Sequence, residues 1–476
     1  MAVTAAERLL MELDPILLAR LQFAFTVMFH IIFPTFTIGL SAYIATLLLL
    51  WVKTGQDRYQ RLARFWTRIF AVSFAMGVVS GIVLSYQFGT NWSRFSIFAG
   101  NIVGPLIGYE VLTAFFLEAT FLGVMLFGWG RVPRWLQVTA AVMVSVGTMI
   151  SAFWVLAANS WMHTPAGHEI VDGVAMPLDW WAIIFNPSFP YRLTHMLNAS
   201  FLTAGFVVLA VGARYWLADR HPEQARVMIK MAVVLLAILA PLQLLIGDLH
   251  GLNTLKHQPI KVAAMEAHWE SDKPVDFHIF AWPDETAEIN RWALSIPNAG
   301  SLVLTHRLNG LIIGLKDVAP QNRPPVKTVF FAFRIMLAIG FFMIAAALVG
   351  AWLLWRGILF ETRWYLRIVA HSWWTGFVAV LAGWVVTESG RQPWVVQGIL
   401  RTADATSPLA ASTVLTTLIL FVIVYTIVFA MGIYYINRLI ERGPQGAAIT
   451  APEHGSPRRP LSSAHDAGRE ALARGS

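Results

Sequence analysis

The stretch that decides the fold is residues 21–52, LQFAFTVMFHIIFPTFTIGLSAYIATLLLLWV, which contains no Asp, Glu, Lys or Arg. About 20 apolar residues in a helix are enough to cross the hydrocarbon core of a bilayer. The segment is therefore predicted to span a membrane. It contains one histidine, His30, and a histidine in such a setting is a first candidate for a functional side chain.

Eight further tracts have the same character, although one of them, Gly104–Gly130, is interrupted by two glutamates. The composition agrees, because 57% of the residues are hydrophobic and only 13% are charged, whereas an ordinary soluble domain is about 25% charged. An all-α integral membrane protein with nine transmembrane helices is predicted. The other seven tracts are Ile69–Ser93, Trp135–Met162, Leu193–Ala213, Met231–Gly247, Ile335–Trp355, Ile368–Thr387 and Ala405–Asn437.

Positive charge in the short connections sets the expected orientation. One set of connections carries 16 Lys and Arg residues and the opposite set carries four. Because Lys and Arg favour the cytoplasmic side, the N-terminus is predicted to lie outside and the C-terminus in the cytoplasm. The richer set is Lys53, Arg58, Arg61, Arg64, Arg68, Arg131, Arg134, Arg214, Arg220, Arg226, Lys230, Arg356, Arg363, Arg367, Arg438 and Arg442, and the poorer set is Arg94, Arg192, Arg391 and Arg401.

The tracts divide the chain into five parts. Residues 1–20 have apolar side chains at helical spacing between charged ones and are predicted to form an interfacial segment. Residues 21–249 hold six spans and residues 328–442 hold three. Between them, residues 250–327 form an outer hydrophilic loop that is longer than a simple connection needs. Residues 443–476, rich in Pro, Gly, Ser and Ala, are predicted to be a disordered cytoplasmic tail.

The composition also excludes several classes of chemistry. With no Cys, the chain has no disulfide, no thiolate ligand for an iron–sulfur cluster and no attachment site for c-type haem. The net charge of +8 is explained by the cytoplasmic connections, and no compact basic tract with interleaved aromatics indicates nucleic-acid binding. A metal would have to be held by His, Met or a carboxylate, and haem suits such a chain because one or two of these ligands suffice per iron.

Ionisable residues inside the apolar tracts are the main functional candidates. A charge at the bilayer centre costs about 2.5–3.5 kcal/mol on insertion scales, so such residues need a reason to be there. Most of them fall in the predicted outer half, which indicates a polar or cofactor-filled centre near that face. They are His30, Glu110, Glu118, His195, Asp248, Arg334, His371, Glu388 and Arg391.

Some of these residues also have a purely structural explanation. A lone His in an apolar helix is more often a packed, hydrogen-bonded residue than a ligand, and His371 is assigned to that class. Arg334 and Arg391 lie near helix ends, where an Arg side chain ordinarily extends so that its charge reaches the membrane–water interface. Met336 is one of 16 Met residues and, taken alone, would be a core residue.

Glu110 and Glu118 are harder to explain structurally, because nothing requires two carboxylates in a lipid-spanning helix. Eight residues apart, they lie about 12 Å apart along a helix axis and about 80° apart around it. Both can therefore face one interior channel, which favours a proton relay.

Five short motifs in the chain occur together in one known family. They are RLQFA at 20–24 leading to His30, QFGTNW at 87–92, Glu110 followed by AFFLE at 114–118, FAFRIM at 331–336, and GW at 383–384 followed by ESGRQPW at 388–394. Through them the chain, from about residue 13 to residue 442, resembles subunit I of the cytochrome bd-type quinol oxidases.

The resemblance implies a nine-span subunit with three haems near the outer face. Such a subunit oxidises quinol outside and reduces dioxygen to water without pumping protons. By position, His195 and Met336 look like the axial pair of a low-spin haem b, a pair suited to electron transfer. His30 and Glu388 look like the single ligands of two high-spin haems.

The resemblance also implies roles for neighbouring residues. Glu110 is expected near the two high-spin haems, and Glu118 is expected to continue the proton path inward. Arg334 and Arg391 are expected to pair with haem propionates, and Trp384 to lie between haems as an electron-transfer aromatic.

In the outer loop, Lys261 and Glu266 match positions implicated in quinol oxidation in the family. If this segment is helical, the two side chains lie about one turn apart. A carboxylate there would accept a quinol proton and release it outside, while protons consumed at oxygen would come from inside. An electrogenic enzyme without a pump is therefore expected.

The loop is shorter than in the long-loop members, so the chain resembles the short-loop branch, which includes cyanide-insensitive oxidases. The expected cofactors are two or three haems b, with haem d as the alternative for the third. The expected partners are a second large membrane subunit, a small single-span subunit as a further candidate, quinol and dioxygen. The expected location is the bacterial cytoplasmic (inner) membrane.

Other classes of protein compete with this interpretation. A haem–copper oxidase needs clustered His residues, and a bc-type cytochrome b needs paired His residues on one helix, whereas no predicted span carries two. The remaining alternative is a proton-coupled transporter, in which Glu110, Glu118 and Asp248 carry protons and His30 and His195 are packing residues. That alternative predicts a colourless protein, although the chain shows no internal repeat typical of many transporters.

Overall fold

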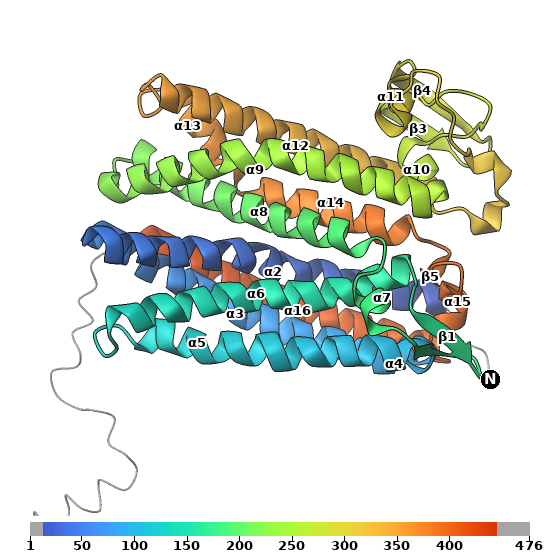
Figure 1. The fold of residues 1–476 in the computed structure, drawn as a ribbon, viewed down its shortest axis with the longest axis horizontal. Helices are drawn as coiled ribbons and strands as arrows, with labels where there is room; N and C mark the ends of the chain where they lie inside the picture. The colour runs from blue at the N-terminus through green and yellow to red at the C-terminus, as the bar shows by residue number, and fades with distance from the viewer. Residues whose placement is uncertain (1–12, 445–476) are drawn as a thin grey trace, which may run out of the picture.

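Long helices lying side by side make up most of the structure (Figure 1). The computed structural model describes residues 13–444. Within that part, eight helices are long and apolar enough to cross a membrane, and a bent pair of helices brings the number to nine when it is counted as one span. The predicted multi-span helical fold is confirmed. The spans are α2 (Pro15–Thr54), α3 (Asp57–Thr90), α4–η1–α5 (Ser93–Phe127), α6 (Arg134–His163), α8 (Phe189–Leu217), α9 (Pro222–His257), α12 (Val326–Trp355), α13–η4–α14 (Arg363–Ser389) and α16 (Ala411–Arg442).

The first span has clear local start and stop signals. The Asp14 carboxylate accepts a hydrogen bond from the backbone N–H of Ile16 at 2.9 Å, and Pro15 occupies the first helical position. The helix ends at Gly55, whose φ of 67° is left-handed and suits glycine. Residues 15–20 of the predicted interfacial segment thus belong to α2. Residues 1–12, and the predicted tail beyond residue 444, lie outside the described part.

The third span changes its helical type in the middle. α4 (Ser93–Glu110) is followed by the π-helical turn η1 (Val111–Phe115) and then by α5 (Phe116–Phe127). The π-turn lies between Glu110 and Glu118, so their relative angle differs from that of an ideal α-helix. π-helical turns are rare and occur often at functional sites.

The eighth span is broken where the sequence predicted one continuous helix. α13 (Arg363–Ala370) and the segment from Ser372, formed by η4 (Ser372–Trp374) and α14 (Thr375–Ser389), meet at 44°. The break falls at His371, whose ring Nδ1 donates to the Arg367 carbonyl at 2.8 Å. The side chain is hydrogen-bonded as expected, but it is exposed rather than packed.

The connections at one end of the bundle carry all the strands of the described chain, in three two-stranded antiparallel sheets (Figure 1). The predicted outer loop begins later than expected, because α9 continues as helix to His257. α12 in turn begins at Val326. The elements at this end are β1 (His168–Val171), β2 (Val174–Pro177), α7 (Trp180–Ile184), α10 (Pro259–Glu266), β3 (Phe277–Asp284), β4 (Ile289–Ile296), α11 (Ala299–Thr305), η2 (Leu315–Asp317), η3 (Pro320–Asn322), β5 (Trp394–Val396), β6 (Leu400–Arg401) and α15 (Thr402–Ala405).

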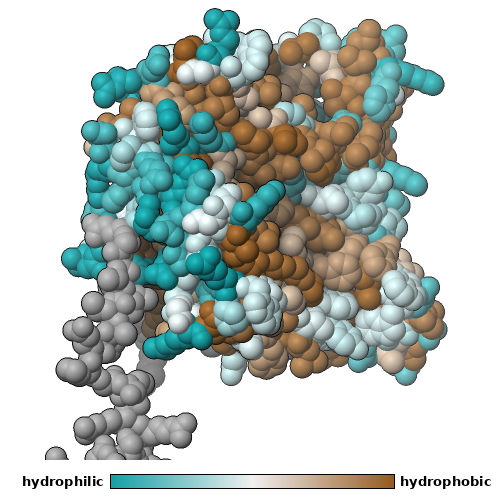
Figure 2. Space-filling model, turned by 60° about the vertical axis from the view of Figure 1, so that its left-hand side comes forward, coloured by the Kyte–Doolittle hydropathy of each residue, from teal (hydrophilic) through white to brown (hydrophobic). Residues whose placement is uncertain are grey.

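Helix α8 is the centre of the bundle and α16 lies at its edge. Most of the apolar part of α8 is buried, whereas most of that of α16 is exposed. Figure 2 shows broad apolar surface on the flank of the bundle and hydrophilic residues gathered toward the end opposite the strands. Such a surface suits lipid or a second membrane subunit.

The close approach of α2 and α8 depends on Gly39. A Cβ at this position would lie 2.6 Å from both Ala204 Cβ and the Ser200 carbonyl oxygen. Gly39→Ala is therefore expected to lower the stability of the bundle, since overpacking costs about 1–3 kcal/mol. The measurement is thermal unfolding followed by tryptophan fluorescence in detergent.

The matched control is Gly340→Ala in α12, where a Cβ would meet no atom within 4 Å. Alanine is a better helix former than glycine by about 1 kcal/mol, so this variant is expected to keep or raise the midpoint temperature of thermal unfolding. Equal midpoints for the two variants would contradict the close packing described here.

Candidate functional site

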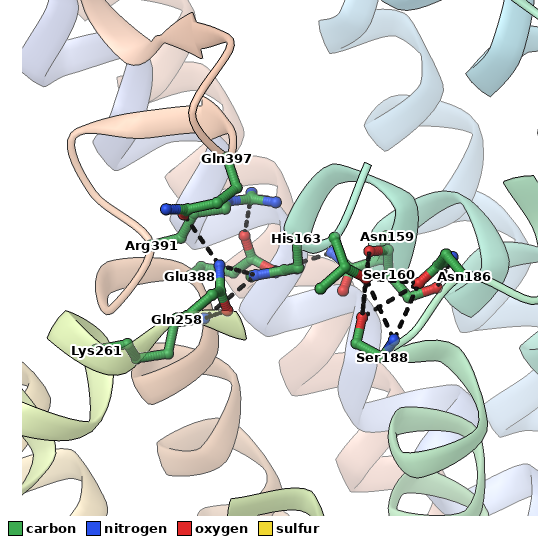
Figure 3. A network of polar contacts seen from close by, with 11 residues as sticks. Asn159, Ser160, His163, Asn186, Ser188, Gln258, Lys261, Glu388, Arg391 and Gln397 are labelled. Atoms are coloured by element: carbon green, nitrogen blue, oxygen red, sulfur yellow. Dashed lines mark hydrogen bonds and ion pairs between the residues drawn. The ribbon is translucent and has the colours of Figure 1, made fainter. Parts of the chain in front are cut away.

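Glu388 lies near the end of α14 and is held by three side chains (Figure 3). Asn159 Nδ2 donates to Glu388 Oε1 at 2.9 Å, and His163 Nε2 lies 3.3 Å from the same oxygen. The Arg391 guanidinium forms an ion pair with the other oxygen, Oε2. A carboxylate at this depth is therefore compensated by charge and by hydrogen bonds, as a buried ion requires.

The same histidine joins Glu388 to the outer loop. Lys261 Nζ lies 3.2 Å from His163 Nδ1 and donates to Gln258 Oε1 at 2.7 Å. Gln258 Nε2 in turn donates to Gln397 Oε1 at 3.0 Å. Side chains from α6, α10 and the segment after α14 thus form one polar network, in which Lys261 is only 4% exposed.

The network contains more cationic groups than carboxylates. Burial and the guanidinium groups of Arg192 and Arg391 hold the pKa of Lys261 well below its usual range, while Glu388 acts in the opposite direction. Arg192 is itself buried, and its Nε has no hydrogen-bond partner. The buried guanidinium groups of Arg192 and Arg391 beside the single carboxylate of Glu388 favour binding of a further anionic group.

Glu266 lies at the other end of α10 from Lys261. Its Oε2 accepts a hydrogen bond from Arg334 Nη2 at 2.6 Å, and both side chains are nearly buried. The Arg334 guanidinium also lies over the rings of Phe277, Phe330 and Phe333, 4.6–5.3 Å from their centroids. Helix α10 thus brings both predicted loop residues to the end of the transmembrane bundle.

Three residues predicted as iron ligands face glycines on neighbouring helices. A Cβ on Gly81 would lie 3.1 Å from His30 Cε1, and a Cβ on Gly247 would lie 3.6 Å from His195 Cε1. A Cβ on Gly383 would lie 3.0 Å from Met336 Sδ. Each of these side chains therefore packs directly against the backbone of a neighbouring helix, which holds the potential ligand in a fixed place.

The hydrogen-bonding state of these residues also fits haem. His195 Nδ1 is buried without a partner, whereas His30 Nδ1 lies 3.0 Å from Ser80 Oγ. Arg334 and Arg391 each keep a buried Nε and Nη1 without a partner. These donors match the carboxylates of haem propionates. Residues 13–444 contain no group of three or more His, Asp or Glu side chains able to hold a bare metal ion.

Both glutamates of the third span lie against α6. Ser151 Oγ donates to Glu110 Oε1 at 2.7 Å. Glu118 is buried, its Oε1 has no partner, and its Cγ would lie 2.7 Å from a Cβ on Gly147. The two carboxylates therefore lie along the same span, and the Oε1 atom of Glu118 has no hydrogen-bond partner.

Trp384 lies on α14 between two groups already described. It follows Gly383, the residue that faces Met336, and it precedes Glu388 by one helical turn. Its side chain is partly buried. Trp384 therefore lies in α14 between Gly383, which faces the predicted low-spin ligand Met336, and the predicted high-spin ligand Glu388.

Sequence reasoning missed several members of the site. His163 follows directly after the apolar tract Trp135–Met162 and so counted as a connection residue. Asn159 and Gln258 are uncharged, and Arg192 was counted only for topology. Asp248, proposed as a proton carrier in the transporter alternative, is not part of the polar network around Glu388.

The chain is similar over nearly its whole length to known terminal oxidase subunits. A family model described as cytochrome bd terminal oxidase subunit I matches residues 18–444. The cytochrome bd ubiquinol oxidase subunit 1 of Bacillus subtilis (strain 168) is 36% identical over 445 residues, which cover 91% of this chain and 95% of that protein. The cytochrome bd-II ubiquinol oxidase subunit 1 of Escherichia coli (strain K12) is 31% identical over 509 residues, covering 92% and 99%.

A solved structure supports the same assignment. The bd oxidase from Geobacillus thermodenitrificans matches with a TM-score of 0.84 at 29% identity, covering 90% of this chain and 99% of that one. The family implies haem as cofactor, a second subunit as partner and a multi-pass location in the bacterial inner membrane. The chain belongs to the cytochrome bd terminal oxidase subunit I family.

Proposed function

We propose that this chain is the haem-bearing subunit of a quinol oxidase that oxidises quinol at the outer face and reduces dioxygen to water. The observation that supports this most is the polar network of Figure 3, because it joins Lys261 of the outer loop to Glu388 at the end of a span. Electron donation and oxygen reduction would thus take place at adjoining sites.

The proposed haem ligands combine the resemblance to the family with the buried and partly unpartnered groups of the site. His195 and Met336 would hold a low-spin haem b, and His30 and Glu388 would each hold a high-spin haem. Bound haem would supply electron transfer and, at an open iron position, oxygen binding. The unpartnered nitrogens of Arg334 and Arg391 would bind propionates, and the Trp384 ring would lie on the electron path.

The outer loop would bind the quinol head. Glu266 would accept a proton from a quinol hydroxyl as the electrons leave, and Lys261 would orient the head by hydrogen bonding. An apolar groove of about 550 Å³ between α12 and α14, bordered by Trp282 and Lys327, would suit the apolar chain of the same molecule.

Charge separation would arise from where protons leave and arrive. The loop containing Glu266 lies at the end of the bundle opposite the connections rich in Lys and Arg, so the released protons would reach the outside. Glu118 and then Glu110 would carry protons from the cytoplasm to oxygen. The oxidase would be electrogenic without a pump, with its N-terminus outside and its C-terminus in the cytoplasm.

The subunit would work in a complex. The exposed apolar face of α16 suits a second large membrane subunit, and a small single-span subunit is a further candidate. The length of the outer loop favours the short-loop, cyanide-insensitive branch, with two or three haems b and haem d as the alternative for the third.

His195→Ala is expected to remove the low-spin haem signal, because it deletes one of two proposed axial ligands. The measurement is reduced-minus-oxidised absorbance of purified complex, with haem types from the pyridine haemochrome spectrum. His257→Ala, at the end of α9, is the control and is expected to keep all bands. A colourless wild-type protein, or unchanged bands in His195→Ala, would favour the proton-coupled transporter.

Glu266→Gln and Lys261→Met are expected to lower quinol oxidation by roughly 10²-fold, the scale of a lost general base or a lost charge-assisted contact. Haem content and reoxidation of the dithionite-reduced enzyme by oxygen are expected to be unchanged. The control is Glu270→Gln, which removes an exposed ion pair with Lys316 in the same loop. If either loop variant lost haem instead, the loop would be structural.

Glu118→Gln is expected to slow oxygen reduction by at least roughly tenfold while quinol still reduces the haems, because the carboxylate would deliver the consumed protons. The matched control is the exposed Glu361→Gln on the connection before α13. Proton uptake by enzyme in liposomes is the direct measurement. Normal uptake in Glu118→Gln would rule out this path.

A further inference from the structure

His163 is the point at which three separate segments of the chain meet. It is the last residue of α6, and its side chain is fully buried. Its Nε2 faces Glu388 of α14 at 3.3 Å. Its Nδ1 faces Lys261 of α10 at 3.2 Å and Gln258, just before α10, at 3.5 Å (Figure 3).

The partners of the ring fix which nitrogen carries the hydrogen. The Glu388 carboxylate, ion-paired with Arg391, can only accept a hydrogen bond, and the amide nitrogen of Gln258 can only donate one, so Nδ1 of His163 is the acceptor. The hydrogen is then on Nε2, which donates to the Glu388 carboxylate. The neutral imidazole therefore satisfies both neighbours at once, with one donor and one acceptor at opposite edges of a rigid ring.

A second set of hydrogen bonds, through Gln397, links the same segments of the chain. Gln258 donates to Gln397, and the backbone N–H of Gln397 donates to the carbonyl of Met162 at 2.9 Å, one residue before His163. The end of α6, the start of α10 and the β5–β6 turn are thus held together twice, by the His163 ring and by Gln397.

Helix α10 needs such anchors. It has eight residues, and a helix this short is not stable by itself. Apolar packing of Ala263 and Ala264 fixes its distance from the bundle. Its direction depends on two polar contacts, Lys261 with His163 near the start and Glu266 with Arg334 at the end.

We propose that His163 is a positioning residue, which holds α10 and its quinol-binding side chains at a fixed place relative to the Glu388 carboxylate. This inference rests on the proposed function for the identity of the substrate. The tether itself rests on the contacts of His163 alone. Without the ring, Lys261, Gln258 and Glu388 each lose a partner, and the start of α10 is held to the end of α6 only through Gln397.

The variants separate tethering from simple packing. His163→Leu fills the space but offers no hydrogen bond, His163→Asn keeps the chemistry on a shorter side chain, and His163→Gln offers one donor and one acceptor at similar reach. His257→Leu is the matched control, since it makes the same change on the neighbouring α9 end, outside the network.

The absence of cysteine in the chain allows a direct measurement of the tether. Nitroxides on Glu169→Cys in β1 and Asp272→Cys after α10, both exposed, report the spread of distances between the two segments in the purified complex. Complex without the introduced cysteines gives the background. The second readout is the KM and kcat for quinol, and the third is the absorption of the haems.

His163→Leu and His163→Asn are expected to broaden the distance distribution and to raise the KM for quinol about tenfold, the effect of losing one hydrogen bond to a charged group. His163→Gln is expected to restore both, and His257→Leu to leave both unchanged. If the complex with His163→Leu does not assemble, the result for His163→Asn tests the proposal instead.

Unchanged distances and KM in His163→Asn would overturn the proposal, and so would a loss of kcat without any change in the loop. The proposed function fails separately, when the complex with native His163 contains no haem or does not oxidise quinol. In that case the distance distributions still test the tether.

Discussion

The structure depends on one constraint, the pairing of ionised side chains inside a bundle made for lipid. Glu388 is compensated by Arg391, His163 and Asn159, and Glu266 by Arg334. A single buried charge without a partner would cost several kcal/mol, which is a large part of the stability of any fold. The end of α14 and the short helix α10 of the outer loop place these residues where the pairs form.

The pairing is incomplete in a way that indicates function. Several guanidinium nitrogens of Arg192, Arg334 and Arg391 are buried and unpartnered, and His195 keeps a free ring nitrogen. Glycines on the neighbouring helices let His30, His195 and Met336 lie directly against the helix backbone. Positive charge without enough carboxylate is what a dianionic cofactor requires. The family to which the chain belongs implies haem as that cofactor.

The sequence predicted the spans well, because a long apolar tract such as residues 21–52 has few alternatives to a membrane helix. It could not predict the π-turn after Glu110 or the break at His371, since both depend on packing between helices. Among site residues, charged ones such as Glu388 and Arg334 stood out against apolar surroundings. His163 did not, because it lies one residue beyond a tract, and only the fold brings it to Glu388 and Lys261.

The central proposal is that haem iron is bound at His30, His195, Met336 and Glu388 in the assembled oxidase. Anomalous scattering at the iron absorption edge from the purified complex tests it most directly, because it locates iron without assuming its ligands. The account predicts three iron positions, one between His195 and Met336, one at His30 and one at Glu388. Absence of iron from the subunit, or iron at positions away from these four residues, would contradict it.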